Sequence, residues 1–121
     1  MVLCCPLNDQ TRGMVDAATV ALMKPGAILI NVARGAVVDT AAVLAALRQG
    51  RLGGAALDVH HRQPLAGDES VFDCPGLLLT PHVAGITATS MLGMSRGAVD
   101  TMLALLRGEQ PPNVVNPEVF R

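Results

Sequence analysis

Three side chains that are suited to catalysis or binding come directly after apolar runs of the chain: Arg34, Asp58 and His82. An arginine can hold a carboxylate through paired hydrogen bonds, and a histidine can move a proton near neutral pH. An aspartate can accept a hydrogen bond from an amide. Each residue also has an ordinary structural interpretation. Arg34 could pair with Asp39 on the surface, Asp58 could cap a turn, and His82 could be structural, so residue type alone leaves these alternatives open.

The apolar runs that precede these side chains are predicted β-strands. They are short, consist of branched or small apolar residues, and are bounded by Pro, Gly or polar residues. The second run shows no alternation of apolar and polar residues, which predicts a strand buried on both faces. The four predicted strands cover residues 2–5, 27–32, 54–59 and 77–80.

Helices are predicted between the first strands and after the last one. Aspartates before the first two are expected to cap them, because a carboxylate there accepts from free N–H groups of the first turn. The third helix shows apolar residues at helical spacing. The three predicted helices follow Asp16, Asp39 and Thr87 and end near residues 23, 49 and 108. A polar loop is expected over residues 60–73, and an extended tail over residues 111–117.

Strands that alternate with helices or long loops predict an α/β fold with a parallel sheet and right-handed crossovers. Parallel strands all end at the same edge of the sheet, and ligands bind outside that edge. We therefore expect Arg34, Asp58 and His82 to line one edge, together with Pro6 after the first strand.

Composition excludes several function classes. The chain has 121 residues, enough for one modest core, and a formal net charge of −1. Nucleic-acid and membrane-surface binding both need a basic patch, so neither is expected. The cysteines, Cys4, Cys5 and Cys74, lack metal or disulfide spacing and are typical of a reducing compartment. A cytoplasmic, soluble domain is the resulting expectation.

Five stretches in this order resemble the D-isomer-specific 2-hydroxyacid dehydrogenases, which include phosphoglycerate dehydrogenase, glyoxylate/hydroxypyruvate reductase and formate dehydrogenase. The resemblance covers the chain from Pro6 to about Thr87, and the second stretch is highly specific. It implies the second half of a doubly wound, Rossmann-like parallel sheet, with about four strands and flanking helices. The stretches are CPLNDQT at 5–11, NVARGAVVD at 31–39, ALDV at 56–59, QPL at 63–65 and TPHVAG at 80–85.

The resemblance implies a hydride transfer between NAD and a small 2-hydroxy or 2-keto acid, and it assigns roles. Arg34 would hold the substrate carboxylate and polarise the carbonyl, His82 would exchange a proton with the substrate oxygen, and Asp58 would bind the nicotinamide carboxamide. NADP remains an alternative cofactor. The acidic residue that would bind the ribose follows a glycine-rich motif in this family, and the chain contains neither. The implied cofactor-binding residues are Cys5, Pro6, Val32, Ala33, Arg34, Asp58, His82 and Gly85.

Gln63 departs from the family pattern. Most of these enzymes have Glu at this place, whose charge pairs with the catalytic histidine and favours its protonated form. Gln63 forms hydrogen bonds but carries no charge, so we expect it to support His82 less well as a proton donor. The formate dehydrogenase branch has Gln-Pro here, which makes that branch an alternative. The tail over residues 112–117 instead looks like the hydroxyacid branches.

The sequence contains no G-x-G-x-x-G motif, the signature that binds the cofactor diphosphate. Residues 1–108 are therefore expected to be part of an NAD-binding domain without its first βαβ unit, and residues 109–121 a tail that returns to a substrate domain. We expect these 121 residues alone to bind NAD weakly and to lack turnover. The first strand would then be an exposed apolar edge, which predicts association into homo-oligomers.

Two functions other than that of an enzyme are also considered for the chain. A non-catalytic remnant that serves as an interaction module is favoured by Gln63 and by the missing glycine motif, and opposed by the intact Arg34, Asp58 and His82. A metal site from His60, His61 and His82 with Cys74 is disfavoured, because adjacent histidines do not easily face one ion. We therefore expect no metal, and regard His60 and His61 as ordinary loop residues.

Overall fold

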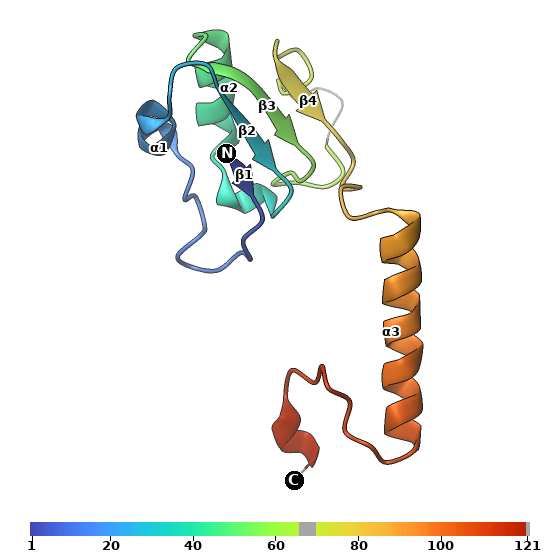
Figure 1. Cartoon of the computed structure of the whole chain (residues 1–121). Helices are drawn as coiled ribbons and strands as arrows, with labels where there is room; N and C mark the ends of the chain where they lie inside the picture. The colour runs from blue at the N-terminus through green and yellow to red at the C-terminus, as the bar shows by residue number, and fades with distance from the viewer. Residues whose placement is uncertain (66–69, 121) are drawn as a thin grey trace. The chain divides into compact units, whose positions relative to one another are not determined.

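The computed structural model describes residues 1–65 and 70–120, and the chain divides into two compact units, Met1–Ala84 and Gly85–Arg121. The first unit contains the sheet and two helices, and the second contains one long helix (Figure 1). The domain boundary expected at residue 108 stays a prediction. Part of the predicted 60–73 loop, residues 66–69, lies outside the described residues.

The four predicted strands are present and form one parallel sheet in the first unit. Their order across the sheet is their order along the chain. This confirms the predicted α/β class with parallel strands. The strands are β1 (Val2–Leu3), β2 (Ala27–Asn31), β3 (Leu52–Leu57) and β4 (Leu77–Leu79).

β3 begins two residues before its predicted start and ends at Leu57 rather than at residue 59. Leu52 pairs with Ala27, after which the register skips Gly53. A Cβ atom at Gly53 would lie 2.5 Å from the carbonyl oxygen of Gly26, so the irregularity requires a glycine there. From the sequence, the start of this strand is predicted too late, because the strand contains two adjacent glycines and glycine is unfavourable within a strand.

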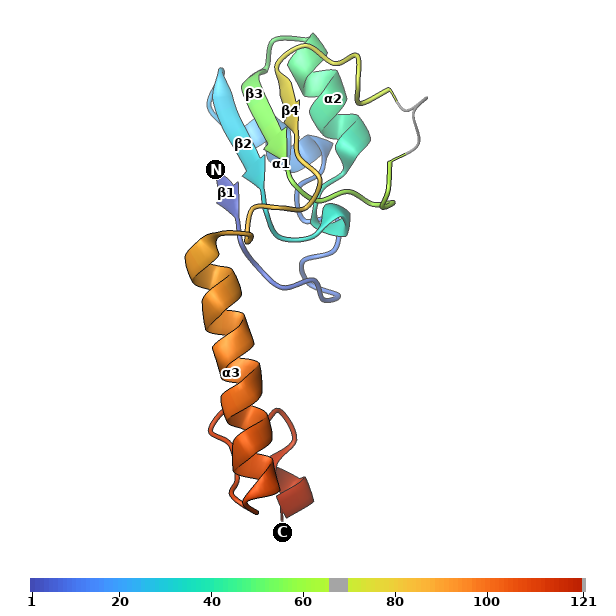
Figure 2. The ribbon, with the colours of Figure 1, turned by 90° about the vertical axis from the view of Figure 1, so that its right-hand side faces the viewer.

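Two helices pack on one face of the sheet, as Figure 2 shows, because successive right-handed crossovers place them on the same side. Both predicted caps are present. Asp16 accepts from the Thr19 N–H at 2.8 Å, and Asp39 accepts from the Ala42 N–H at 3.2 Å. The two helices are α1 (Ala17–Leu22) and α2 (Thr40–Arg48).

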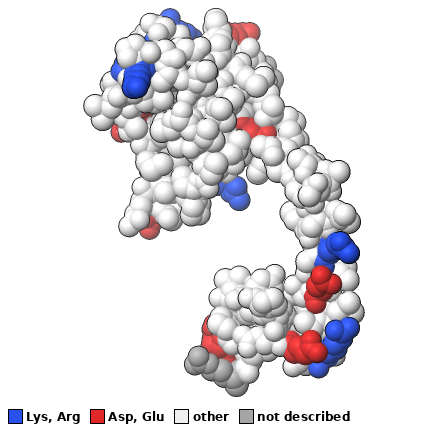
Figure 3. All heavy atoms as spheres, viewed as in Figure 1, with Lys and Arg blue, Asp and Glu red and all other residues white. Residues whose placement is uncertain are grey.

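The core lies between these helices and one face of the sheet. Leu29 on β2 is 0% exposed, whereas its neighbour Ile28 is 58% exposed. The expectation that this strand is buried on both faces is therefore wrong. α1 and α2 both cover the face of the sheet that contains Leu29. The described part of the β3–β4 connection contains no helix that could cover the face that contains Ile28. The face of the first unit seen in Figure 3 is mainly uncharged.

β1 forms one edge of the sheet, and its first residue, Val2, is 59% exposed. The strand is shorter than expected, because only two of the residues predicted for it pair with β2. An apolar edge strand is a site at which another chain can add. Self-association through this edge stays a prediction.

The second unit consists mainly of α3 (Ala88–Leu106), which begins where the sequence predicts. Thr87 accepts from the Ser90 N–H at 3.0 Å, and Ser90 Oγ accepts from the Thr87 N–H at 2.9 Å, which together form a capping box. No residue of α3 is buried. The tail ends in a short 3₁₀ helix, η2 (Pro117–Phe120), which was not predicted. Among the described helices, none combines the length and apolar character needed to cross a bilayer.

Leu29→Ala is expected to lower the free energy of unfolding by about 2 to 5 kcal/mol, because it leaves a cavity in the core. Leu78→Ala, the matched change at a residue that is 62% exposed, is expected to alter it by no more than about 0.5 kcal/mol. Urea unfolding followed by circular dichroism measures both. Equal losses in the two variants would contradict the one-sided core.

Candidate active site

The four strands end in one row across the sheet. Leu3 pairs with Asn31, Asn31 with Leu57, and Leu57 with Leu79. The segments that follow leave the sheet together at its carboxyl edge, as the sequence predicts for these strand ends. Each of the predicted site residues Pro6, Arg34, Asp58 and His82 lies one to three residues beyond this row.

The carboxylate of Asp58 organises the segment after β4. Asp58 is 5% exposed, and its Oδ1 accepts from the Thr80 hydroxyl at 2.5 Å and from the Val83 N–H at 2.8 Å. Its Oδ2 accepts from the Ala84 N–H at 2.9 Å. Successive backbone N–H groups that converge on one anion form a nest. Asp58 therefore anchors the turn that carries His82, which is the structural interpretation considered for it.

The hydrogen bonds to Asp58 outweigh its burial. Burial by itself raises the pKa of this carboxyl, but the hydrogen bonds from Thr80, Ala84 and Val83 and the nearby His82 lower it, and the net pKa lies below its ordinary value. Asp58 is therefore ionised at neutral pH, and the ionised form is the one that can accept all three hydrogen bonds.

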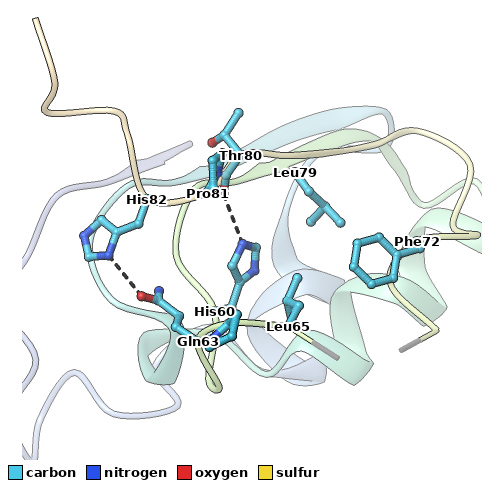
Figure 4. Close-up of a pocket in the computed structure, with 9 residues that line it drawn as sticks. His60, Gln63, Leu65, Phe72, Leu79, Thr80, Pro81 and His82 are labelled. Atoms are coloured by element: carbon cyan, nitrogen blue, oxygen red, sulfur yellow. Dashed lines mark hydrogen bonds between the residues drawn. The ribbon is translucent and has the colours of Figure 1, made fainter. Parts of the chain in front are cut away.

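His82 occupies an unusual backbone conformation, with φ of 59°, the left-handed region in which non-glycine residues are uncommon. Residues held in such regions concentrate at functional sites. Its Nδ1 lies 3.1 Å from Oε1 of Gln63 (Figure 4). Because a carbonyl oxygen only accepts, Nδ1 carries the hydrogen, and Nε2 is the ring atom left to exchange a proton.

The segment that carries Arg34 is closed by a buried amide. Asn31, 1% exposed, donates from Nδ2 to the Arg34 carbonyl at 3.0 Å, and its Oδ1 accepts from the Ala33 N–H at 3.0 Å. The Arg34 side chain is exposed and donates to the Ala33 carbonyl at 2.6 Å. Asp39, its predicted surface partner in the alternative interpretation, caps α2. From the sequence, we did not assign Asn31 a role in positioning this segment. The only sequence feature that could have indicated the role is the presence of a side-chain amide at the end of a strand.

Gly35 begins a short 3₁₀ helix, η1 (Gly35–Val37), and packs tightly against the chain after β3. A Cβ atom at Gly35 would lie 2.1 Å from the carbonyl carbon of His60 and 2.5 Å from the nitrogen of His61. Only a glycine permits this approach of two backbones. The segment after β2 and the segment after β3 are therefore in direct contact.

His60 and His61 point at two different carbonyl groups. Nε2 of His60 lies 3.1 Å from the Thr80 oxygen, and Nε2 of His61 lies 2.8 Å from the Val38 oxygen. The arrangement gives no support to a metal site built on this pair. Within the part of the chain that the structure describes, no three His, Cys, Asp or Glu side chains cluster as metal ligands would.

A cavity of about 380 Å³ opens between β4 and the loop after β3 (Figure 4). Its walls are mainly apolar, and the His82–Gln63 pair lies on one side. The residues that line it are His60, Gln63, Pro64, Leu65, Phe72, Leu79, Thr80, Pro81 and His82.

The other predicted cofactor residues lie at the ends of β1 and β2. The Val32 N–H donates to the Leu3 carbonyl at 3.3 Å, so the two backbones leave the sheet side by side. Cys5 is half-buried, Pro6 is exposed and Ala33 is buried. Gly85 belongs to the second unit.

Residues 1–84 match the family described as D-isomer specific 2-hydroxyacid dehydrogenase, NAD binding domain. Among curated proteins, the chain is 42% identical over 116 residues to glyoxylate/hydroxypyruvate reductase B of Enterobacter agglomerans, a match that covers 96% of this chain and 36% of the relative. The chain thus spans about a third of the length of the curated relatives that it matches.

Two solved structures agree with this match. A D-isomer specific 2-hydroxyacid dehydrogenase of Xanthobacter autotrophicus, in complex with NADPH and MES, is 37% identical with a TM-score of 0.79, over 99% of this chain and 49% of that one. The NAD-complexed enzyme of Lactobacillus delbrueckii is 31% identical with a TM-score of 0.83, over 94% and 39%. The names of these relatives favour neither the formate branch nor a non-catalytic remnant.

Asp58→Asn is expected to lower the free energy of unfolding at neutral pH by about 1 to 3 kcal/mol, because an amide accepts fewer of the three hydrogen bonds. The lowered pKa of Asp58 means that its contribution is fully present above the ordinary value of 3.8 and is lost as the pH falls through the folded-state pKa.

Unfolding free energies measured from about pH 3 to pH 7 test this expectation, and Asp73→Asn, at an exposed carboxylate, is the control for removing one charge. The difference between the unsubstituted chain and Asp58→Asn should shrink towards the acid end. A difference that stays constant across the range would contradict the anchoring role.

Proposed function

The chain belongs to the D-isomer-specific 2-hydroxyacid dehydrogenase family, and we propose that it supplies catalytic and cofactor-binding residues to an oxidoreductase that acts on a small 2-hydroxy or 2-keto acid. Substrates of the size of glyoxylate or hydroxypyruvate are the proposed class, since a relative is named for both. The observation that carries the proposal is the His82 turn. Asp58 anchors this turn at the end of β4, in the same row of strand ends from which Arg34 emerges.

Arg34 is the proposed carboxylate-binding residue. A guanidinium presents its N–H donors in a planar fork that matches the two oxygens of a carboxylate. In the described residues one donor is used by the Ala33 carbonyl, and the exposed side chain keeps the others for a substrate. A carbonyl group next to the bound carboxylate would be polarised by the same positive charge. Arg34 thereby orients the substrate at the carboxyl edge.

His82 is the proposed proton-exchanging residue. Gln63 occupies Nδ1, so Nε2 would donate a proton to the substrate oxygen during reduction and accept it during oxidation. Gln63 orients the ring but provides no negative charge to favour the imidazolium. Gln63 therefore fixes the orientation of the His82 ring without adding a charge of its own.

The strand ends fit one part of a nicotinamide dinucleotide. The adjacent backbones at Cys5–Pro6 and Val32–Ala33 would line the ring, and Asp58 Oδ2, with one hydrogen bond in the described residues, keeps capacity to accept from a carboxamide. When bound, the nicotinamide supplies or accepts the hydride. The chain has no G-x-G-x-x-G, so the diphosphate contacts do not come from these residues. NAD is the proposed cofactor, with NADP as the alternative.

The proposal is tested by replacing the matching stretch of the Enterobacter agglomerans reductase with this chain and following NADH or NADPH oxidation with glyoxylate and hydroxypyruvate. We expect turnover. Arg34→Gln should lower kcat/KM by roughly a hundredfold, because paired, charge-assisted hydrogen bonds to the substrate are lost. His82→Gln should lower kcat by about two orders of magnitude or more.

Arg48→Gln, at an exposed arginine on α2, is the matched control and should leave the kinetics unchanged. The proposal fails if the folded chimera binds cofactor but shows no turnover. It also fails if Arg34→Gln behaves like Arg48→Gln. The isolated chain assayed in parallel tests the separate expectation that it lacks turnover.

Gln63→Glu in the same chimera is expected to shift the fall of the reduction rate with pH upward by about one pH unit, because an adjacent negative charge favours imidazolium. Rates measured across the neutral and alkaline range give the shift. A rate and a pH profile that both remain unchanged would show that Gln63 does not act on the proton of His82.

A further inference from the structure

His60 contacts both catalytic segments of the first unit. Its ring nitrogen Nε2 and the Thr80 oxygen are 3.1 Å apart, at a partly buried position. The carbonyl oxygen can only accept, so Nε2 carries the hydrogen and donates it. Figure 4 shows the ring directed at the segment that leads into His82.

Thr80 is therefore held from two directions. Its hydroxyl donates to Asp58 at 2.5 Å, and its carbonyl accepts from His60. One hydrogen bond from the side chain of Thr80 and one to its main-chain carbonyl fix the direction in which the chain leaves β4. This direction determines where Pro81 and His82 lie. His82 must also be held there in a left-handed conformation.

The backbone of His60 supports the other catalytic segment. Gly35, directly after Arg34, lies so close that a Cβ atom there would be 2.1 Å from the His60 carbonyl carbon. A displacement of His60 would move or release this contact, because the two backbones pack directly against each other. One residue thus contacts the segments that carry the proposed carboxylate-binding and proton-exchanging side chains.

We propose that His60 is a positioning residue that couples the Arg34 segment to the His82 turn, through its backbone contact with Gly35 and its hydrogen bond to the Thr80 carbonyl. The mechanistic meaning of this coupling rests on the proposed function, but the coupling itself is a property of the fold. His61 provides the internal comparison, since its ring donates instead to the Val38 carbonyl, away from the His82 turn.

The coupling is tested by NMR on the isotopically labelled full chain and three variants. His60→Phe keeps a flat ring but removes the donor, and His60→Gln restores an N–H donor. His61→Phe is the matched control on the adjacent residue. The readouts are the proton distribution on the two ring nitrogens of His82 and the hydrogen exchange of the Val83 and Ala84 amides.

In His60→Phe, we expect the hydrogen on His82 to redistribute away from Nδ1, and the Val83 and Ala84 amides to exchange roughly fivefold faster, the effect of losing one hydrogen bond. His60→Gln should recover most of both changes, and His61→Phe should show neither. The proposal is overturned if His60→Phe leaves His82 unchanged, if His61→Phe acts equally, or if His60→Gln behaves like His60→Phe.

A second measurement uses the unsubstituted chain, so its result does not depend on whether any variant folds. A scalar coupling across the hydrogen bond, between Nε2 of His60 and the Thr80 carbonyl carbon, should be detected, and its absence would overturn the proposal. None of these readouts requires turnover. A chain that passes them while the chimera shows no activity would retain the positioning role of His60 and lose the proposed reaction.

Discussion

The hydrogen bonds that the ionised carboxylate of Asp58 accepts hold the site together. This carboxylate is buried directly after the end of β3. It accepts from the Thr80 hydroxyl and from two consecutive backbone N–H groups, and so converts the irregular chain after β4 into a defined turn. A buried carboxylate is costly unless it is fully hydrogen-bonded. Here the same bonds that satisfy it also hold His82 in a left-handed conformation, next to Gln63.

The site is assembled from short links between strand ends. Asn31 closes the segment that presents Arg34, Gly35 lets that segment touch the backbone at His60, and the ring of His60 reaches the segment before His82. The Asn31 link is local to the end of β2, whereas the other two links join the ends of neighbouring strands, which the sheet register already aligns. The parallel sheet brings the segments near one another, and these links determine how they are oriented.

Much of this architecture is predictable from local patterns. The caps at Asp16 and Asp39 and the start of α3 at Thr87 depend on neighbouring residues only, and all three are present. The start of β3 and its one-residue register skip were missed, because they depend on contact between Gly53 and a distant backbone. The contact of His60 with Thr80 spans 20 residues of sequence and leaves no local signal. Whether a strand is covered on one face or two is likewise decided by distant segments.

Arg34 and His82 are proposed to meet one substrate at the carboxyl edge of the sheet. A crystal structure of the active chimera with NADH and oxamate, an unreactive analogue of a small 2-keto acid, would show whether they do. We expect the oxamate carboxylate on the Arg34 guanidinium, with its amide carbonyl oxygen, which stands in for the keto oxygen of a substrate, within hydrogen-bonding distance of Nε2 of His82. Oxamate bound elsewhere, or bound with Nε2 of His82 turned away from it, would contradict this shared site.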